Sequence, residues 1–211
     1  MITVSKSIKI GGIDEDLGFK YNGKDSIERY SVFMDLEHYI YKVPLCIGVF
    51  GACVYDHNED MVHLTQYMIE SEEDKIPILN LTYEYLKKFS QVKKYMVTFS
   101  GNNDFGVIEH LFKENNIDFN IRESFVDVDL QREYEKINKV GVGLKNLEKE
   151  LNIEREGEVL TGFQLAKIIR DIGIKGKSCP NSLSSRILSY NEYDVVNLFK
   201  IIKHWTKIMN K

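Results

Sequence analysis

The chain has 211 residues, 43% of them hydrophobic, and its 28 Lys and Arg residues stand against 32 Asp and Glu residues, for a net charge of −4. That length suits a single domain with a sizeable core, so we expect residues 1–211 to form one domain. The acidic balance argues against a protein that binds nucleic acid through bulk charge, since such proteins are usually basic. Any nucleic acid would have to meet a local basic patch or bound metal ions.

The three cysteines, Cys46, Cys53 and Cys179, form no CxxC pair. This spacing argues against a zinc site or a disulfide framework and favours a reducing, cytoplasmic environment. We expect neither a signal peptide nor a membrane-spanning segment, because no apolar run approaches the roughly 18 residues that a span needs.

The first third of the chain is predicted to be mostly β-structure. Residues 1–28 are polar and contain several glycines, and we expect either a polar extension or, from the alternation of Ile2, Val4 and Ile8, an edge strand. Three stretches rich in apolar and β-branched residues follow and predict strands that pair as an antiparallel meander. They cover residues 30–34, 45–54 and 61–69, and the first of them ends at Asp35.

The rest of the chain is predicted to be mainly helical. Apolar residues at helical spacing predict a helix over 72–89, and a fourth strand over 94–99 leads into a turn. Further elements are expected as a helix over 105–112, a short fifth strand within 118–125, and helices over 127–137, 144–151, 161–172 and 182–209. This order predicts an α/β fold in which a central mixed sheet is flanked by helices.

Two acids stand close together where the first core strand is expected to end. Asp35 and Glu37 are two residues apart, so in a strand they share one face. Two carboxylates placed together repel unless a cation offsets their charge, and Mg²⁺ or Mn²⁺ prefers such oxygen ligands. The alternative is an acidic strand end that leads into a solvated loop.

Two further positions place acids at helices. Asp104 follows the fourth strand at the start of a helix, where an acid also stabilises the helix dipole without any other role. Tyr190 and Asp194 lie four residues apart in the last helix, about 40° around its axis and roughly 6 Å along it. One helix face therefore presents a phenol and a carboxylate together. The alternative is a half-buried aromatic residue beside a surface acid.

The order of these motifs resembles the DEDD superfamily of 3′–5′ exonucleases. The phenol at position 190 is typical of its tyrosine subgroup, and Ser189 stands where the histidine subgroup has His. Residues 142–153 (VGLKNLEKELNI) and 190–195 (YNEYDV) are similar to segments of the YprB-type RNase H-like family. This similarity extends from about Tyr30 to His204 and implies an RNase H-like fold.

The resemblance also implies a mechanism. Two divalent cations, Mg²⁺ or Mn²⁺, would be held by Asp35, Glu37, Asp104 and Asp194, and Tyr190 would orient the attacking water. The substrate would be DNA or RNA, entering as a single-stranded 3′ end.

Other polar residues near these motifs are candidates for binding phosphate. The turn before Asp104 contains Asn102 and Asn103, whose amide groups could meet a phosphate at a helix start, although a capping turn explains them equally. Lys145 and Arg155 could contact phosphates, or lie on a solvated helix face. His57 and His63 flank a strand start without further ligands, which favours surface roles.

Two departures from the family pattern leave an alternative open. His38-Tyr39-Ile40 follows the acid pair where the family usually has Thr-Gly, and Asp104 lies one residue nearer Gly101 than expected. The chain could therefore be a catalytically weakened RNase H-like module that binds nucleic acid or a protein partner. The choice between DNA and RNA, between exonuclease and endonuclease, and the oligomeric state also stay open.

Overall fold

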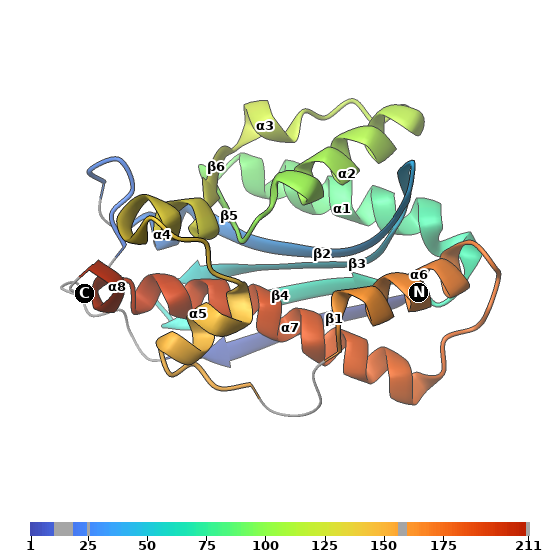
Figure 1. Cartoon of the computed structure of the whole chain (residues 1–211). Coiled ribbons are helices and arrows are strands. Elements are labelled where there is room, and N and C mark those ends of the chain that lie inside the picture. The colour runs from blue at the N-terminus through green and yellow to red at the C-terminus, as the bar shows by residue number, and fades with distance from the viewer. Residues whose placement is uncertain (11–18, 25, 156–159, 210–211) are drawn as a thin grey trace.

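A computed structural model describes residues 1–10, 19–24, 26–155 and 160–209 (Figure 1). Its centre is a mixed sheet of six strands in the order β1-β4-β3-β2-β5-β6. The strands are β1 (Ile2–Lys9), β2 (Ser31–Tyr41), β3 (Val43–Asp56), β4 (Met61–Met68), β5 (Tyr95–Thr98) and β6 (Val126–Asp129). Strands β2, β3 and β4 form the predicted antiparallel meander, and β5 and β6 extend the sheet in parallel.

The sheet lies between helices, as predicted from the order of elements (Figure 1). The helices are α1 (Lys75–Ser90), α2 (Asn102–Glu114), α3 (Ile121–Ser124), α4 (Leu130–Asn138), α5 (Leu144–Glu150), α6 (Gly162–Gly173), α7 (Asn181–Lys203) and α8 (Thr206–Met209). Short 3₁₀ turns, η2 (Ile27–Tyr30) and η3 (Glu72–Asp74), precede β2 and α1. In the described part of the chain, no helix has the length and apolar character that crossing a bilayer requires.

The two faces of β2 have different roles because strand side chains alternate. Val32 and Met34 belong to the core cluster that includes the buried apolar residues of α1 and α2. Phe33 points the other way and packs against Phe199 of α7, with 5.6 Å between ring centroids. Asp35 has the same parity as Phe33, so it points towards the face that α7 covers.

Several element boundaries differ from the sequence prediction. The expected strand within 118–125 is instead a loop and helix α3, which Asn120 caps by accepting hydrogen bonds from the backbone amides of Arg122 and Glu123. The strand that follows β5 is β6, residues 126–129. It pairs with β5 and includes the first residues of the segment 127–137, where a helix was expected. The helix after it begins at Leu130, capped by the Asp129 side chain.

The two ends of the chain also differ in detail from the prediction. The alternating residues near the start do form an edge strand, β1, which is antiparallel to β4. Part of the predicted 1–28 segment, residues 11–18 and 25, lies outside the described residues. The long final helix ends at Lys203, and α8 follows after a short break that contains the buried Trp205.

Candidate metal centre

Strand β2 carries its acid pair further inside the sheet than the sequence suggested. The strand continues beyond Asp35 to Tyr41, so Asp35 and Glu37 lie within it rather than at its end. Both residues are paired with β3, where Asp35 lies opposite Gly51 and Glu37 opposite Val49. The two carboxylates share the face that α7 covers.

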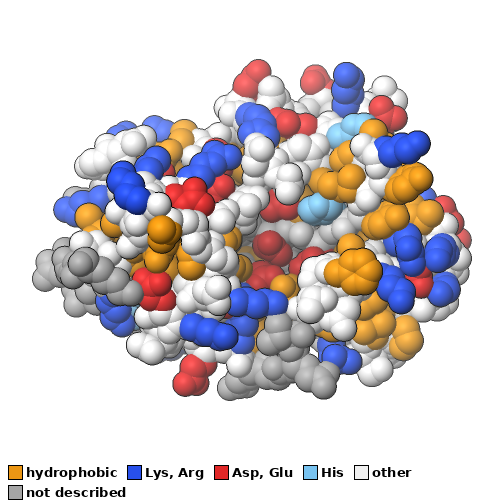
Figure 2. Space-filling model, viewed as in Figure 1, with side chains coloured by type: hydrophobic (Ala, Val, Ile, Leu, Met, Phe, Trp, Pro, Cys, Tyr) orange, Lys and Arg blue, Asp and Glu red, His pale blue; other side chains and the backbone are white. Residues whose placement is uncertain are grey.

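Three of the four predicted acids meet in one place and the fourth, Asp104, lies near them. Together they are here called the four-acid cluster: Asp35, Glu37, Asp104 and Asp194. One carboxylate oxygen from each of Asp35, Glu37 and Asp194 lies within 4.8 Å of the others. Asp104 is close enough for its charge to raise the pKa of both Asp35 and Glu37. Acidic side chains gather in a hollow in the middle of the face shown in Figure 2, with Lys and Arg side chains at its lower edge.

Crowding and loss of water both raise the pKa values in this cluster. Desolvation, followed by the charges of the neighbouring acids, raises the pKa of Asp35 well above its usual range and that of Glu37 to about 8. Desolvation and the charge of Asp129 raise the pKa of Asp104 to about 8. Desolvation also raises the pKa of Asp194. A divalent cation would offset these charges, so the carboxylate donor set fits Mg²⁺ or Mn²⁺.

A polar network that the sequence did not reveal holds Asp35 against α7. Asn191 donates a hydrogen bond of 3.0 Å to the Asp35 carboxylate, and Gln66 of β4 donates one of 2.8 Å to Asn191. Gly51 makes room for this contact, because a Cβ atom there would meet the Asn191 side-chain oxygen at 2.0 Å. The only sequence signal was the position of Asn191 between Tyr190 and Asp194.

Asp104 is placed by the loop before α2. It is buried in the first turn of that helix. Asp129, which sequence reasoning missed, accepts a hydrogen bond of 2.9 Å from the Ser100 backbone amide while it also caps α4. Ser100 has a left-handed backbone with φ of 58°, a conformation that few residues other than glycine adopt. The Asp129 carboxylate thus ties this turn, and with it Asp104, to the end of β6.

Asp194 is paired with a buried arginine. Arg155 donates a hydrogen bond to the Asp194 carboxylate and two more to Glu148 of α5, and its side chain is only 10% exposed. Asn197, one turn after Asp194 on α7, donates a hydrogen bond of 2.9 Å to the same Glu148. The expectation that Arg155 lies on a solvated helix face is therefore wrong, because its side chain is buried in an ion pair with Asp194 of α7.

The Tyr190 side chain lies next to the cluster, and two cationic side chains stack on its ring. The Nζ atom of Lys145 lies 4.8 Å from its ring centroid and the Arg155 guanidinium carbon 5.7 Å. Desolvation, followed by the charge of Asp194, raises the pKa of Tyr190, so the phenol keeps its proton as a hydrogen-bond donor. Lys145 donates a hydrogen bond of 3.1 Å to the Leu160 carbonyl, and its charge lowers the pKa of Glu37.

The two predicted asparagines are exposed at the start of α2, directly before Asp104. Asn102 accepts a hydrogen bond of 3.3 Å from Arg122, which in turn forms an ion pair with Glu109. Asn103 is exposed beside it. Both side chains therefore stand on the surface next to the buried acid.

His38 also lies beside the cluster, although the sequence reasoning treated it only as a departure from a family pattern. Its Nδ1 atom is 3.7 Å from an Asp104 carboxylate oxygen. Desolvation lowers the pKa of His38, and the nearby Leu36 backbone partly offsets this effect, so the imidazole is mostly neutral at pH 7.

Comparison with known families agrees with this arrangement. The sequence model of the family described as RNase_H superfamily matches residues 32–206, which is most of the chain. The chain belongs to the RNase H superfamily. No curated protein matches it. The matched region contains all four acids of the cluster, and domains of this superfamily generally use divalent metals.

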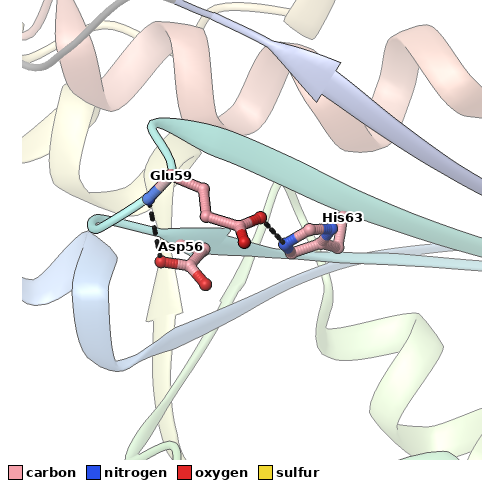
Figure 3. Close-up of side chains that lie close together, drawn as sticks. All are labelled: Asp56, Glu59 and His63. Atoms are coloured by element: carbon pink, nitrogen blue, oxygen red, sulfur yellow. Dashed lines mark hydrogen bonds and ion pairs between the residues drawn. The ribbon is translucent and has the colours of Figure 1, made fainter.

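A second group with metal-ligand chemistry lies on this RNase H superfamily domain, at the hairpin between β3 and β4 (Figure 3). Asp56, Glu59 and His63 each place a ligand atom within 4.8 Å of the others, so His63 has neighbours that the sequence reasoning did not foresee. Asp56 already accepts hydrogen bonds from the backbone amides of Asn58 and Glu59, and Glu59 lies 3.9 Å from His63. These contacts are what an exposed turn is expected to contain.

Proposed function

We propose that this protein is a metal-dependent nuclease, a 3′–5′ exonuclease of the YprB-type family within the tyrosine subgroup of the DEDD superfamily. The observation that carries the proposal is the four-acid cluster itself. Its members come from β2, α2 and α7, far apart in the sequence, and crowd together at a high electrostatic cost. Membership of the RNase H superfamily supports a hydrolytic nuclease.

The proposal assigns a part to each polar residue of the site. Asp35, Glu37, Asp104 and Asp194 would hold two divalent cations, Mg²⁺ or Mn²⁺. When bound, two such ions stabilise the attacking and leaving oxygens of a phosphoryl displacement. Tyr190, which keeps its proton, donates a hydrogen bond that orients the attacking water.

Substrate binding must be local, because the chain as a whole is acidic. Lys145 lies next to Tyr190 and supplies positive charge at the edge of the site. Asn102 and Asn103 are exposed beside Asp104 and offer hydrogen bonds to phosphate oxygens. We propose that these three residues bind the phosphate backbone at a single-stranded 3′ end of DNA or RNA.

A direct nuclease assay tests the proposal. Single-stranded DNA and RNA oligomers labelled at the 5′ end would be incubated with the protein and Mn²⁺ or EDTA. We expect a ladder of 3′-shortened products with Mn²⁺ and none with EDTA. The Asp194→Asn variant should give no ladder in either condition. Glu192→Gln is the matched control, because Glu192 lies on the same helix but forms an ion pair with Lys6. Turnover by Asp194→Asn at the wild-type rate would contradict the assignment.

A second candidate is a catalytically weakened RNase H-like module that binds nucleic acid or a protein partner. The contact that favours it is the ion pair between Arg155 and Asp194, since the arginine already neutralises one acid of the cluster. Thermal denaturation with and without Mn²⁺ separates the two. A ligand at 100 times its Kd stabilises the native state by about 2.7 kcal/mol, so an intact centre must raise the Tm. Absence of any shift would favour the weakened module.

A further inference from the structure

His38 lies beside the four-acid cluster at Asp104. Strand side chains alternate, so His38 shares the side of Met34 and Leu36, which faces the core cluster that contains the buried apolar residues of α2. Asp104 stands in the first turn of that helix. The Nδ1 atom of His38 is buried, has no hydrogen-bond partner among the described residues, and lies 3.7 Å from an Asp104 carboxylate oxygen.

We propose that His38 is a nitrogen ligand of the metal centre and biases it towards Mn²⁺ and other transition-metal ions over Mg²⁺. The inference rests on the metal centre of the proposed function, and it adds a residue to the four carboxylates. A buried nitrogen without a partner is costly, and a cation beside Asp104 would give it one.

The spacing of the two atoms fits this role. At 3.7 Å the His38 nitrogen and the Asp104 oxygen are too far apart for a direct hydrogen bond. Two ligand atoms that each lie about 2.1 Å from one ion are separated by about 3.0 Å at a right angle and by about 3.6 Å at 120°. The observed separation is close to the wider of these values, so one ion can lie between the two atoms after a small adjustment.

The chemistry of imidazole explains the expected selectivity. Mg²⁺ is held almost entirely by oxygen ligands, whereas imidazole nitrogen suits first-row transition metals. A neutral imidazole also adds a ligand without adding a fifth negative charge to a site that is already crowded with acids. His38 therefore improves binding of Mn²⁺ more than binding of Mg²⁺.

Pulsed electron paramagnetic resonance of the Mn²⁺-loaded protein tests the proposal, because a directly bound nitrogen couples to the metal's unpaired electrons. We expect a ¹⁴N coupling in the wild type that disappears in His38→Gln and in His38→Thr. The matched control is His63→Gln at the hairpin group of Figure 3, which must leave the coupling in place. Titrations should show a Kd for Mn²⁺ raised about tenfold in the His38 variants, with the Kd for Mg²⁺ changed less than about threefold.

Other results would overturn the inference. A coupling that persists in both His38 variants with an unchanged Kd for Mn²⁺, or one that is lost only in His63→Gln, would show that His38 does not bind the metal. Denaturation in EDTA checks that each variant is folded. If the wild type shows the coupling but cleaves no oligomer, the nuclease proposal fails and His38 remains a ligand. If it cleaves oligomers without the coupling, only the His38 inference fails.

Discussion

The Asn191 side chain on α7 donates a hydrogen bond of 3.0 Å to the Asp35 carboxylate on β2. This contact joins two segments that are 156 residues apart in the sequence. It fixes the helix that carries Tyr190 and Asp194 against the strand that carries Asp35 and Glu37. The geometry of the four-acid cluster therefore depends on a buried amide that is itself not one of the proposed metal ligands.

Gly51→Ala should disturb this contact. The new Cβ atom would meet the Asn191 oxygen at 2.0 Å, and Asn191 is fully buried, so it has little room to move. We expect a loss of about 1–3 kcal/mol in the free energy of unfolding and weaker Mn²⁺ binding. Urea denaturation and Mn²⁺ titration measure the two effects. Gly106→Ala on α2 is the control and should be neutral or stabilising. Apart from its chain neighbours and the adjacent helix backbone, no atom of the described residues lies within 4 Å of its Cβ position.

Arg155→Met should destabilise the protein strongly. The substitution leaves the buried Glu148 and Asp194 carboxylates without their cation, and breaking such a pair costs about 3–5 kcal/mol. Arg155→Lys should restore part of the loss. The exposed Lys136, which forms an ion pair with Glu133, offers the comparison, since Lys136→Met should cost no more than about 1 kcal/mol. Equal losses in chemical denaturation of the two methionine variants would refute this account of Arg155.

Tyr190→Phe should separate catalysis from binding. The phenyl ring keeps its place beneath Lys145 and Arg155, while the hydroxyl that orients the water is lost. We expect kcat for oligomer hydrolysis to fall by about 100-fold, with the Kd for Mn²⁺ unchanged. Steady-state kinetics and metal titration measure the two quantities. A variant with wild-type kcat would remove Tyr190 from the proposed mechanism.

The metal-free protein should lose stability as the pH rises. The pKa values of Glu37 and Asp104 are raised to about 8 in the folded state, so between about pH 4 and pH 8 the folded state binds more protons than the unfolded state. The free energy of unfolding then decreases with pH across this range. In EDTA we expect a lower Tm at pH 8.5 than at pH 5.5.

Mn²⁺ should reverse this trend, because a bound cation replaces the protons on the cluster. The double variant Glu37→Gln with Asp104→Asn is the control and should show a much flatter pH dependence in EDTA. A wild-type Tm that rises with pH in EDTA would show that these carboxylates are not crowded as described.

The sequence alone determined much of this protein because the relevant patterns are local. Alternation of side chains along a strand places Asp35 and Glu37 on one face, and helical periodicity places Tyr190 and Asp194 on another. The meander and most helices followed from the same periodicities. The fifth strand was misplaced, since β6 has only four residues, and so short an alternation of Val and Asp is hard to separate from the helix that follows it.

Only the tertiary structure decided how the local patterns meet. The approach of Asp104 to the acid pair, the burial of Arg155 against Asp194 and the position of Gln66 behind Asn191 all depend on distances between separate elements. The approach of His38 to Asp104 depends on how α2 packs against β2. Periodicity is a property of one segment, whereas these contacts arise from packing, which brings together residues that are remote in the chain.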